Sequence, residues 1–365
     1  MDRMEFWKLL MQVRTSNIKN TSTIALFNYL KENTPKHLYR YMKGTDYDLK
    51  NLENNEIWGS KISTFNDPFE ALPSFNEDDF ITSFIKSIEK LDLGNLNLES
   101  MKNNFNLSFP NANLGSIVSL FNSFSLTNSN ILKGEIIKAV NTLYKNEIEQ
   151  IRKTAIDSYF RDYANNFYIA CFSQDVQSLP MWYHYTKGGT GFVLEYDFSD
   201  NFELCKNSDT CGVKNTCQTF CYPNPIFPVF YSNTRFDMVN IVIRKFLLEL
   251  SNKIGIEYED QIRDPFLVLK SLLLKSKEWE YEKEWRILSR GGKVKECKDL
   301  HVKIMKKKPI IVIMGPKLSR FNDEELRNYN GNKEKLKEIC KKQGIKFCET
   351  FLDYKNTRFE LNLPN

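Results

Sequence analysis

The residues of this chain best suited to chemistry stand between Trp279 and Ile287, where three glutamates alternate with aromatic residues. Read as a strand, the stretch places Glu280, Glu282 and Glu284 on one face, because side chains alternate between the two faces of a strand. A row of carboxylates backed by aromatic rings is costly to build unless something uses the charge. The stretch therefore predicts a site without naming its substrate.

Other polar residues are embedded among aromatic ones elsewhere in the chain. Such surroundings are typical of a pocket lining, although the same residues would also suit a structural hydrogen-bond network. The candidates for binding a cofactor or ligand are Tyr39, Arg40, Asn66, Asp67, Trp182 and Tyr185, and the candidates for catalysis are Ser173, His184, Glu282 and Glu284.

Strands and helices must bring these residues together. The hydrophobic pattern predicts two short helices within residues 1–34, a long helix over 131–163, and further helices over 237–253, 264–276 and 333–342. It predicts strands over 37–41, 57–60, 167–173, 191–196, 310–314 and 346–351. The expected fold is α+β, with a central mixed or antiparallel sheet and helical insertions.

Four blocks of the sequence combine aromatic and polar residues: residues 38–41, residues 57–70 ending in Phe-Asn-Asp-Pro-Phe-Glu, residues 171–196 with Met-Trp-Tyr-His-Tyr, and residues 279–287. Together these blocks resemble the bacterial domain of unknown function called DUF2971. The resemblance covers residues 37–320 and departs from the family in a helical insert at 78–165 and a cysteine-rich insert at 200–227. It leaves residues 1–36 as an N-terminal helical extension and 321–365 as a helix and strand packed on the same domain.

The order of Arg40, Ser173 and Glu282-Lys283-Glu284 is similar to that of ADP-ribosyltransferases of the toxin type. That similarity implies that Arg40 holds the pyrophosphate of NAD and that Ser173 orients the catalytic carboxylate. It also implies that Glu284 holds the ribose and that Glu282 activates the acceptor. The protein would then be an NAD-using toxin or antiphage defence effector, in keeping with some relatives that look like phage-defence effectors. The alternative is a structural ion pair of Glu284 with Arg40 or Arg286.

Two other functions fit the same residues. His184 has an unperturbed pKa near neutrality, so a hydrolase or nuclease could use His184 with Asp67 and Glu284, and His37 with Asp67 could contribute to a metal site. Alternatively His184 is a packed residue of an aromatic segment. A third possibility is a module without catalytic activity that senses a nucleotide in an aromatic pocket.

A cysteine cluster follows the third block. Cys205, Cys211, Cys217 and Cys221 have the spacing C-x5-C-x5-C-x3-C, and four thiolates so close in sequence predict a structural zinc. The alternative is a surface insertion with free thiols.

The composition narrows the partners. The formal net charge is +5, from 51 basic and 46 acidic residues, which permits contact with nucleic acid without arguing for it. The dense basic spots are Lys306–Lys308 and Lys341–Lys342. The first residues do not resemble a signal peptide and no apolar run is long enough to span a membrane, so we expect a cytoplasmic protein. The expected partners are a small nucleotide ligand and a nucleic-acid or protein acceptor, and the sequence does not specify an oligomeric state.

Overall fold

The computed structural model describes most of the chain. The described residues are 1–13, 20–76, 164–200, 226–239, 266–290, 300–316, 323–353 and 358–362, with isolated positions at 79–80, 82–83, 86, 153, 156–157 and 243. The cysteine cluster at 205–221 lies outside them, as do most of the predicted long helix at 131–163 and most of the predicted helix at 237–253.

The chain divides into two compact units. The first comprises residues 1–71, 164–233 and 265–365, and the second comprises 72–163 and 234–264. Within the second unit, Ser74 and Asp237 form a parallel β-bridge. All the candidate site residues that the structure describes belong to the first unit.

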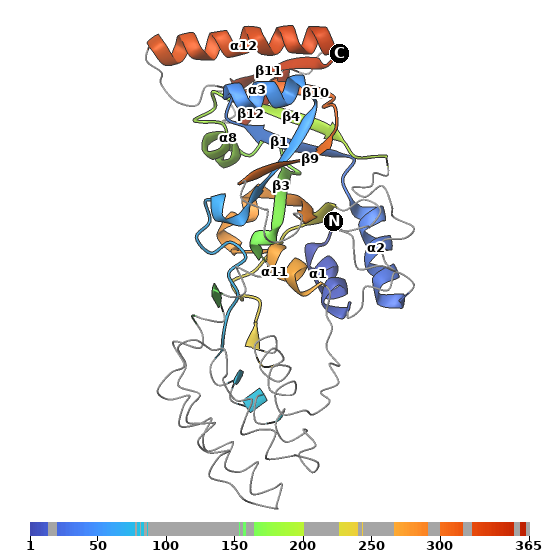
Figure 1. Cartoon of the computed structure of the whole chain (residues 1–365). Helices are drawn as coiled ribbons and strands as arrows, with labels where there is room; N and C mark the ends of the chain where they lie inside the picture. Colours follow the sequence, from blue (N-terminus) through green and yellow to red (C-terminus); the bar gives the residue numbers. More distant parts are fainter. Residues whose placement is uncertain are drawn as a thin grey trace, which may run out of the picture. The chain divides into compact units, whose positions relative to one another are not determined.

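The first unit is built on a ten-stranded sheet, counted over the described residues (Figure 1). Eight strands follow in the order β12-β11-β10-β4-β1-β3-β2-β9, and β8 pairs with β3 and β5. The strands are β1 (His37–Met42), β2 (Glu56–Lys61), β3 (Phe167–Ser173), β4 (Phe192–Asp197), β5 (Ile226–Pro228), β8 (Glu284–Arg290), β9 (His301–Lys306), β10 (Ile311–Met314), β11 (Lys346–Asp353) and β12 (Arg358–Asn362). Because β10 and β11 are parallel and the other pairs antiparallel, the sheet is mixed, and the predicted α+β class is confirmed.

Strand β3 is the junction of the sheet. It pairs with β1 through Tyr39 and Ser173, with β2 through Ser60 and Ile169, and with β8 along its whole length. All but one of its seven residues are buried, as expected for a strand covered on both faces.

The register divides the side chains between two faces. Arg40 lies opposite Leu194, on the face that carries the main core with Phe172, whereas Tyr39 lies opposite Ser173. Ser173 in turn lies opposite Glu284. Since opposite residues of paired strands share a face, Tyr39, Ser173 and Glu284 point to one side of the sheet and Arg40 points to the other.

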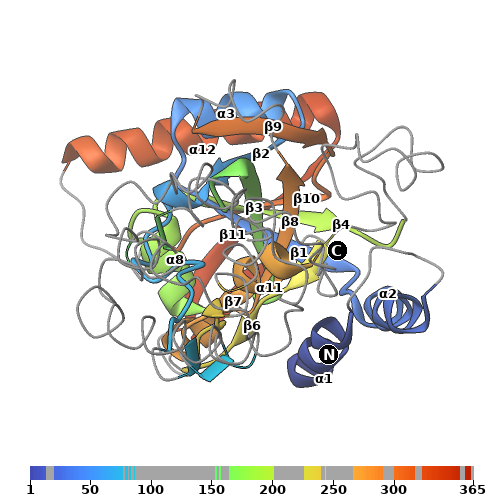
Figure 2. The same ribbon diagram turned by 60° about the horizontal axis from the view of Figure 1, so that its bottom comes forward.

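Helices cover both faces. Helix α3 (Asp46–Glu53) and helix α12 (Asp323–Gln343) pack their leucines on the face of Arg40, and Figures 1 and 2 show the two helices side by side. Helix α8 (Leu179–Tyr185) packs Trp182 on the other face, against Val193 and Ile313. Thr45 begins α3 with a capping box, in which its side chain accepts from the backbone of Asp48 while the Asp48 carboxylate accepts from the backbone of Thr45.

Two N-terminal helices complete the unit, α1 (Arg3–Gln12) and α2 (Thr21–Asn33), as the sequence predicted. Trp7 of α1 stacks on Phe230 with ring centroids 4.9 Å apart. The remaining elements are α11 (Leu267–Leu272), the two-residue strands β6 (Phe230–Tyr231) and β7 (Leu274–Lys275), and the 3-10 helices η1 (Ile62–Thr64), η2 (Ala164–Asn166) and η3 (Lys277–Glu282). Among the described residues, no helix is both long and apolar enough to cross a membrane.

Gly191 permits a close approach between chain segments at the start of β4. A Cβ atom at this position would lie 2.0 Å from the carbonyl oxygen of Met42, at the end of β1. We therefore expect Gly191→Ala to lower the free energy of unfolding by about 1–3 kcal/mol, measured by urea unfolding. The matched control is Gly331→Ala in α12, where a Cβ would meet no described atom within 4 Å. An equal loss in both variants would contradict this account.

Candidate active site

Five charged side chains are buried together beside the β3–β8 pair. Lys275 comes from β7, Glu282 ends η3, Glu284 and Arg286 belong to β8, and Glu70 ends the Phe65–Glu70 block; none is more than 4% exposed. We call these five residues the charge cluster. Burying an ion is costly unless it is paired, so the pairing within the charge cluster decides what each member can do.

The backbone between Glu282 and Glu284 differs from the prediction. Residues 277–282 form the 3-10 helix η3, Lys283 takes a left-handed conformation with φ 46°, and β8 starts only at Glu284. The prediction of one continuous strand over 279–287 is therefore wrong. A straight strand would align three carboxylates on one face with only Arg286 to offset their repulsion, whereas the break leaves Glu280 exposed and turns Glu282 and Glu284 toward Lys275 as well.

Arg286 is the anchor of the charge cluster. Its guanidinium donates two hydrogen bonds to the Glu284 carboxylate, at 2.8 and 2.9 Å, one to Glu70 at 2.7 Å and one to the carbonyl of Leu272 at 2.6 Å. The two-pronged contact with Glu284 is the strongest geometry available to an arginine and a carboxylate. The predicted alternative of a structural ion pair between Glu284 and Arg286 is confirmed.

Lys275 binds the carboxylates from the other side. Its ammonium donates to Glu282 Oε2 at 2.5 Å and to Glu284 Oε2 at 3.3 Å, and lies 3.9 Å from Glu70 Oε2. Burial alone would lower the pKa of Lys275, but the charges of Glu284, Glu282 and Glu70 outweigh burial and hold the pKa well above its ordinary value. Lys275 is therefore held as a cation by three carboxylates.

Charge balance singles out Glu282. Two cations face three carboxylates, so one carboxylate is in excess. Burial and the charge of Glu284 raise the pKa of Glu282 to about 7, despite the hydrogen bond from Lys275. The pKa of Glu284 moves the other way: burial would raise it, but Arg286 and Lys275 hold it below its usual range. Two neighbouring carboxyl groups with pKa values pushed apart are a common arrangement in acid–base sites.

Tyr185 connects Glu282 to the surface. The Tyr185 hydroxyl donates to Glu282 Oε1 at 2.5 Å and accepts a hydrogen bond from Asn66 Nδ2 at 3.3 Å. Burial, followed by the charge of Glu282, raises the pKa of Tyr185, so this phenol stays protonated near neutral pH. Tyr185 is half-buried and Asn66 is exposed, which makes the chain Glu282–Tyr185–Asn66 a hydrogen-bonded path from the charge cluster to solvent.

Half-buried aromatic rings cover the two cations. The Lys275 ammonium lies 4.9 Å from the centroid of the Trp279 ring, and the Arg286 guanidinium lies 5.6 Å from that of Phe65. Tyr281 packs beside Trp279 at 6.1 Å. Ring faces thus cover the two cations of the charge cluster, and such faces favour cations on one side and planar groups on the other.

Arg3 of α1 supports the site from behind. Its guanidinium donates to the carbonyl oxygens of Val229 and Glu284, at 2.5 and 2.9 Å, and lies over the rings of Tyr231 and Trp285. The Tyr231 hydroxyl accepts from the Glu284 backbone N–H at 2.8 Å. These contacts fix the backbone of Glu284, the first residue of β8, which lies two residues after Glu282.

The structure separates Arg40 from the carboxylates. Arg40 donates to the carbonyl of Trp58 at 2.5 Å and lies over the Phe172 ring, on the face of the sheet opposite Ser173 and Glu284. The predicted convergence of Arg40, Ser173 and Glu284 in one cleft is therefore wrong. Strand parity is the reason, because the neighbour of Tyr39 must point to the other face.

Ser173 is brought to the site but has another role there. Its hydroxyl donates to the backbone carbonyls of Glu282, at 2.6 Å, and Asp175, at 3.1 Å. The prediction required Ser173 to orient the Glu284 carboxylate. Instead, Ser173 holds the backbone of η3 and thereby the position of Glu282.

The remaining candidates are dispersed. His184 is exposed, and its ring contacts that of Tyr183. Asp67 is buried and accepts from the Phe69 backbone N–H at 2.8 Å, while His37 bonds Glu195 at 2.6 Å. No described contact joins His184, Asp67 and Glu284. Trp182 is a core residue whose indole donates to the carbonyl of Val176, and Tyr39 packs beside it.

Two members of the charge cluster were missed by sequence reasoning. Glu70 stood at the end of a block already chosen, and Lys275 stands after the apolar run Leu272-Leu273-Leu274. A lysine in such a run signals a buried cation, and a buried cation requires carboxylates nearby. For metals, the described residues contain no group of three or more histidine, cysteine or acidic side chains that could hold an ion. The predicted zinc ligands Cys205, Cys211, Cys217 and Cys221 lie outside those residues.

Comparison with known families agrees with part of this picture. The family described as "Protein of unknown function (DUF2971)" matches residues 181–287, which confirms the resemblance in the stretch that holds Tyr185, Lys275, Glu282, Glu284 and Arg286. No curated protein and no solved structure matched the chain.

Proposed function

We propose that the chain is an enzyme in which Glu282 and Tyr185 form the acid–base pair of a nucleotide-directed reaction. The observation that carries this proposal is the excess carboxylate: Glu282 has a pKa of about 7 and is bonded to a half-buried tyrosine on the path to solvent. A group that titrates near the working pH can both accept and return a proton, which suits general acid–base catalysis. The other members of the charge cluster hold Glu282 in place and set its pKa.

The substrate that we favour is NAD. Glu284 lies opposite Ser173 in the paired strands β3 and β8, and the Ser173 hydroxyl donates to the backbone carbonyl of Glu282 at the end of η3. The half-buried rings of Trp279 and Tyr281 suit the stacking of a planar nicotinamide or adenine. In the reaction, the bond between ribose C1′ and the nicotinamide nitrogen breaks, and its electron pair leaves with nicotinamide. The acceptor oxygen bonds to C1′, and its proton passes through Tyr185 to Glu282. This assignment gives Arg40 and Glu284 no contact with substrate.

Nicotinamide release from NAD by the purified full chain tests the proposal, with water and with added acceptor proteins. We expect Glu282→Gln to lower the rate by about 100-fold or more, and Tyr185→Phe to lower it by roughly tenfold, because a positioned base contributes about 10²–10⁴. The rate of the unaltered chain should rise as pH increases through about 7, because the base must be ionised to accept the proton.

The matched control is Glu280→Gln. Glu280 belongs to the same helix η3 but is exposed, so its replacement should leave the rate within about twofold. Thermal melting of each variant checks that it is folded. The proposal would be overturned if Glu282→Gln released nicotinamide at the rate of the unaltered chain. It would also be overturned if the unaltered chain released no nicotinamide with any acceptor.

A further inference from the structure

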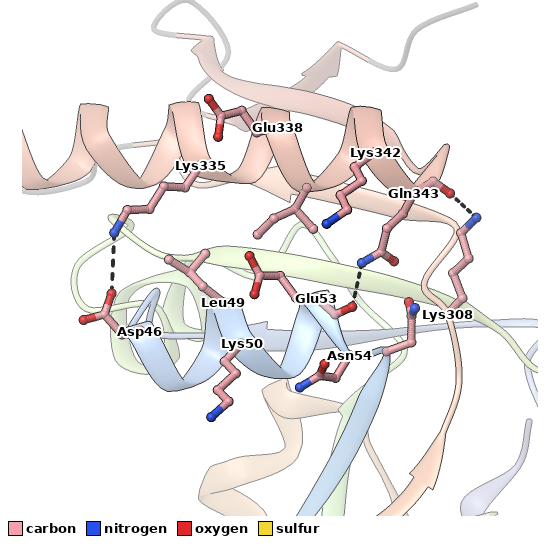
Figure 3. Close-up of a pocket in the computed structure, with 12 residues that line it drawn as sticks. Asp46, Leu49, Lys50, Glu53, Asn54, Lys308, Lys335, Glu338, Lys342 and Gln343 are labelled. Atoms are coloured by element: carbon pink, nitrogen blue, oxygen red, sulfur yellow. Dashed lines mark hydrogen bonds and ion pairs between the residues drawn. The ribbon is translucent and has the colours of Figure 1, made fainter.

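A groove of about 1010 Å³ runs between helices α3 and α12, away from the charge cluster on the other face of the sheet (Figure 3). Four lysines line it, two of which are Lys308 and Lys342, together with the three acids Asp46, Glu53 and Glu338. Lys335 forms an ion pair with Asp46 across the groove, at 3.6 Å. The groove lining is therefore nearly balanced in charge, with four lysines and three acids. Further lysines lie around one end of the groove.

Two lysine-rich segments that are far apart in the sequence meet at that end. The Lys308 ammonium donates to the carbonyl of Gln343, at the end of α12, and the Lys346 backbone N–H donates to the carbonyl of Ile310 at 3.2 Å. The Lys307 backbone N–H donates to the carbonyl of Asn55 at 2.8 Å, so the turn that follows α3 also contacts this end of the groove. Six lysines belong to the segments that meet here, and we call them the basic end of the groove: Lys306, Lys307, Lys308, Lys341, Lys342 and Lys346.

These lysines lack the acidic partners that neighbouring lysines have. Nearby, Lys303 lies 3.3 Å from Glu56 and Lys333 lies 2.6 Å from Glu349. Within the described part of the chain, by contrast, none of the six lysines of the basic end forms an ion pair with a carboxylate. All but the half-buried Lys307 are exposed. Lys307 differs from the others, because its ammonium lies 5.2 Å from the centroid of the Phe198 ring. Exposed lysines without salt bridges attract polyanions.

We propose that the basic end and the groove bind a single-stranded nucleic acid. The six lysines neutralise backbone phosphates, and Tyr47 supplies an aromatic face on α3. Tyr47 is 47% exposed, is held edge-on by Trp58 at 5.5 Å, and lies on α3 outside the groove lining, one residue after Asp46. A charged groove with a stacking residue is the general design of single-strand binding sites. Glu53 and Glu338 keep phosphates off the groove walls, and their oxygens can accept from base amino groups.

Fluorescence anisotropy with a labelled mixed-sequence 20-nucleotide RNA or DNA strand tests this site in the full chain. We expect Lys341→Gln/Lys342→Gln, at two exposed positions, to weaken binding by about tenfold near 100 mM salt. The slope of log affinity against log salt should fall by about 1.4, because each lost phosphate contact accounts for about 0.7 in a single strand. Tyr47→Ala should weaken binding without changing that slope, because stacking releases no counterions.

The control variant removes the same charge elsewhere. Lys8→Gln/Lys31→Gln takes two lysines from the N-terminal helices α1 and α2, and it should leave affinity and slope unchanged. Equal weakening by both double variants would overturn the site, because net charge alone would then explain binding. It would also be overturned by an unaltered chain that binds no strand, that binds duplexes more tightly, or that binds only vesicles containing anionic phospholipid.

Discussion

Replacing Glu284 by glutamine is expected to lower the free energy of unfolding by about 3–5 kcal/mol, the usual cost of breaking a buried ion pair from one side. Glu284 accepts two hydrogen bonds from Arg286 and one from Lys275, and both cations are buried with it. Glutamine would remove the carboxylate that the Arg286 guanidinium binds with two hydrogen bonds, and would turn an amide N–H₂ toward a donor. Urea unfolding followed by circular dichroism measures the loss.

A double-mutant cycle separates the pair from its surroundings. Arg286→Met alone should cost a similar amount, because it leaves Glu284 and Glu70 facing Lys275 only. The double variant Glu284→Gln/Arg286→Met should cost clearly less than the two single costs added, since neither charge is then left alone. The pairing account would be refuted by a Glu284→Gln variant that unfolds within about 1 kcal/mol of the unaltered chain.

A loss of stability in Glu284→Gln would also affect the turnover of that variant. A loss of turnover in Glu284→Gln would follow from disruption of the β3–β8 pair, whether or not Glu284 touches a substrate. Glu282 is the informative position, because its replacement removes the excess charge from the charge cluster and leaves two cations with two carboxylates.

The strands were predictable because their apolar runs are long and clearly bounded. Residues 167–173, 191–196 and 310–314 are nearly continuous apolar stretches, and they form β3, β4 and β10. The meeting of Asn66, Ser173, Tyr185 and the glutamates was also foreseeable, because polar residues among aromatic ones indicated a common site. The break at Lys283 was not, since an alternating pattern fits a strand as well as it fits a 3-10 turn followed by a strand.

The face on which Arg40 lies could not be derived from its own strand. The side chains of β1 alternate between the two faces of the sheet in either orientation of the strand. The pairing of Tyr39 with Ser173, which in turn pairs with Glu284, decides which side chains of β1 share a face with Glu284. A shift of one residue in that register would exchange the two faces. Residue order along the chain, which suggested Arg40 as a partner of Glu284, carries no information about this register.

Glu282→Gln is expected to stabilise the protein above neutral pH, in contrast to Glu284→Gln. The pKa of Glu282 is about 7 in the fold against an ordinary value of 4.5, so the folded chain holds this proton more tightly than the unfolded chain does. The stability that Glu282 contributes is therefore complete below about pH 4.5 and is lost as pH rises through about 7. Glutamine mimics the protonated carboxyl at every pH, so the variant escapes that loss.

The difference between the two variants and the unaltered chain should therefore depend on pH in opposite ways. Relative to the unaltered chain, Glu282→Gln should gain up to roughly 3 kcal/mol as pH rises from about 5 to 8, the amount that corresponds to its raised pKa. The pKa of Glu284 is lowered, so the stability that it contributes is present above its ordinary pKa and declines only in acid. The cost of Glu284→Gln should thus shrink toward low pH. Urea midpoints across this range measure both trends, and a Glu282→Gln variant less stable than the unaltered chain at pH 8 would show that Glu282 is held as an ion by Lys275.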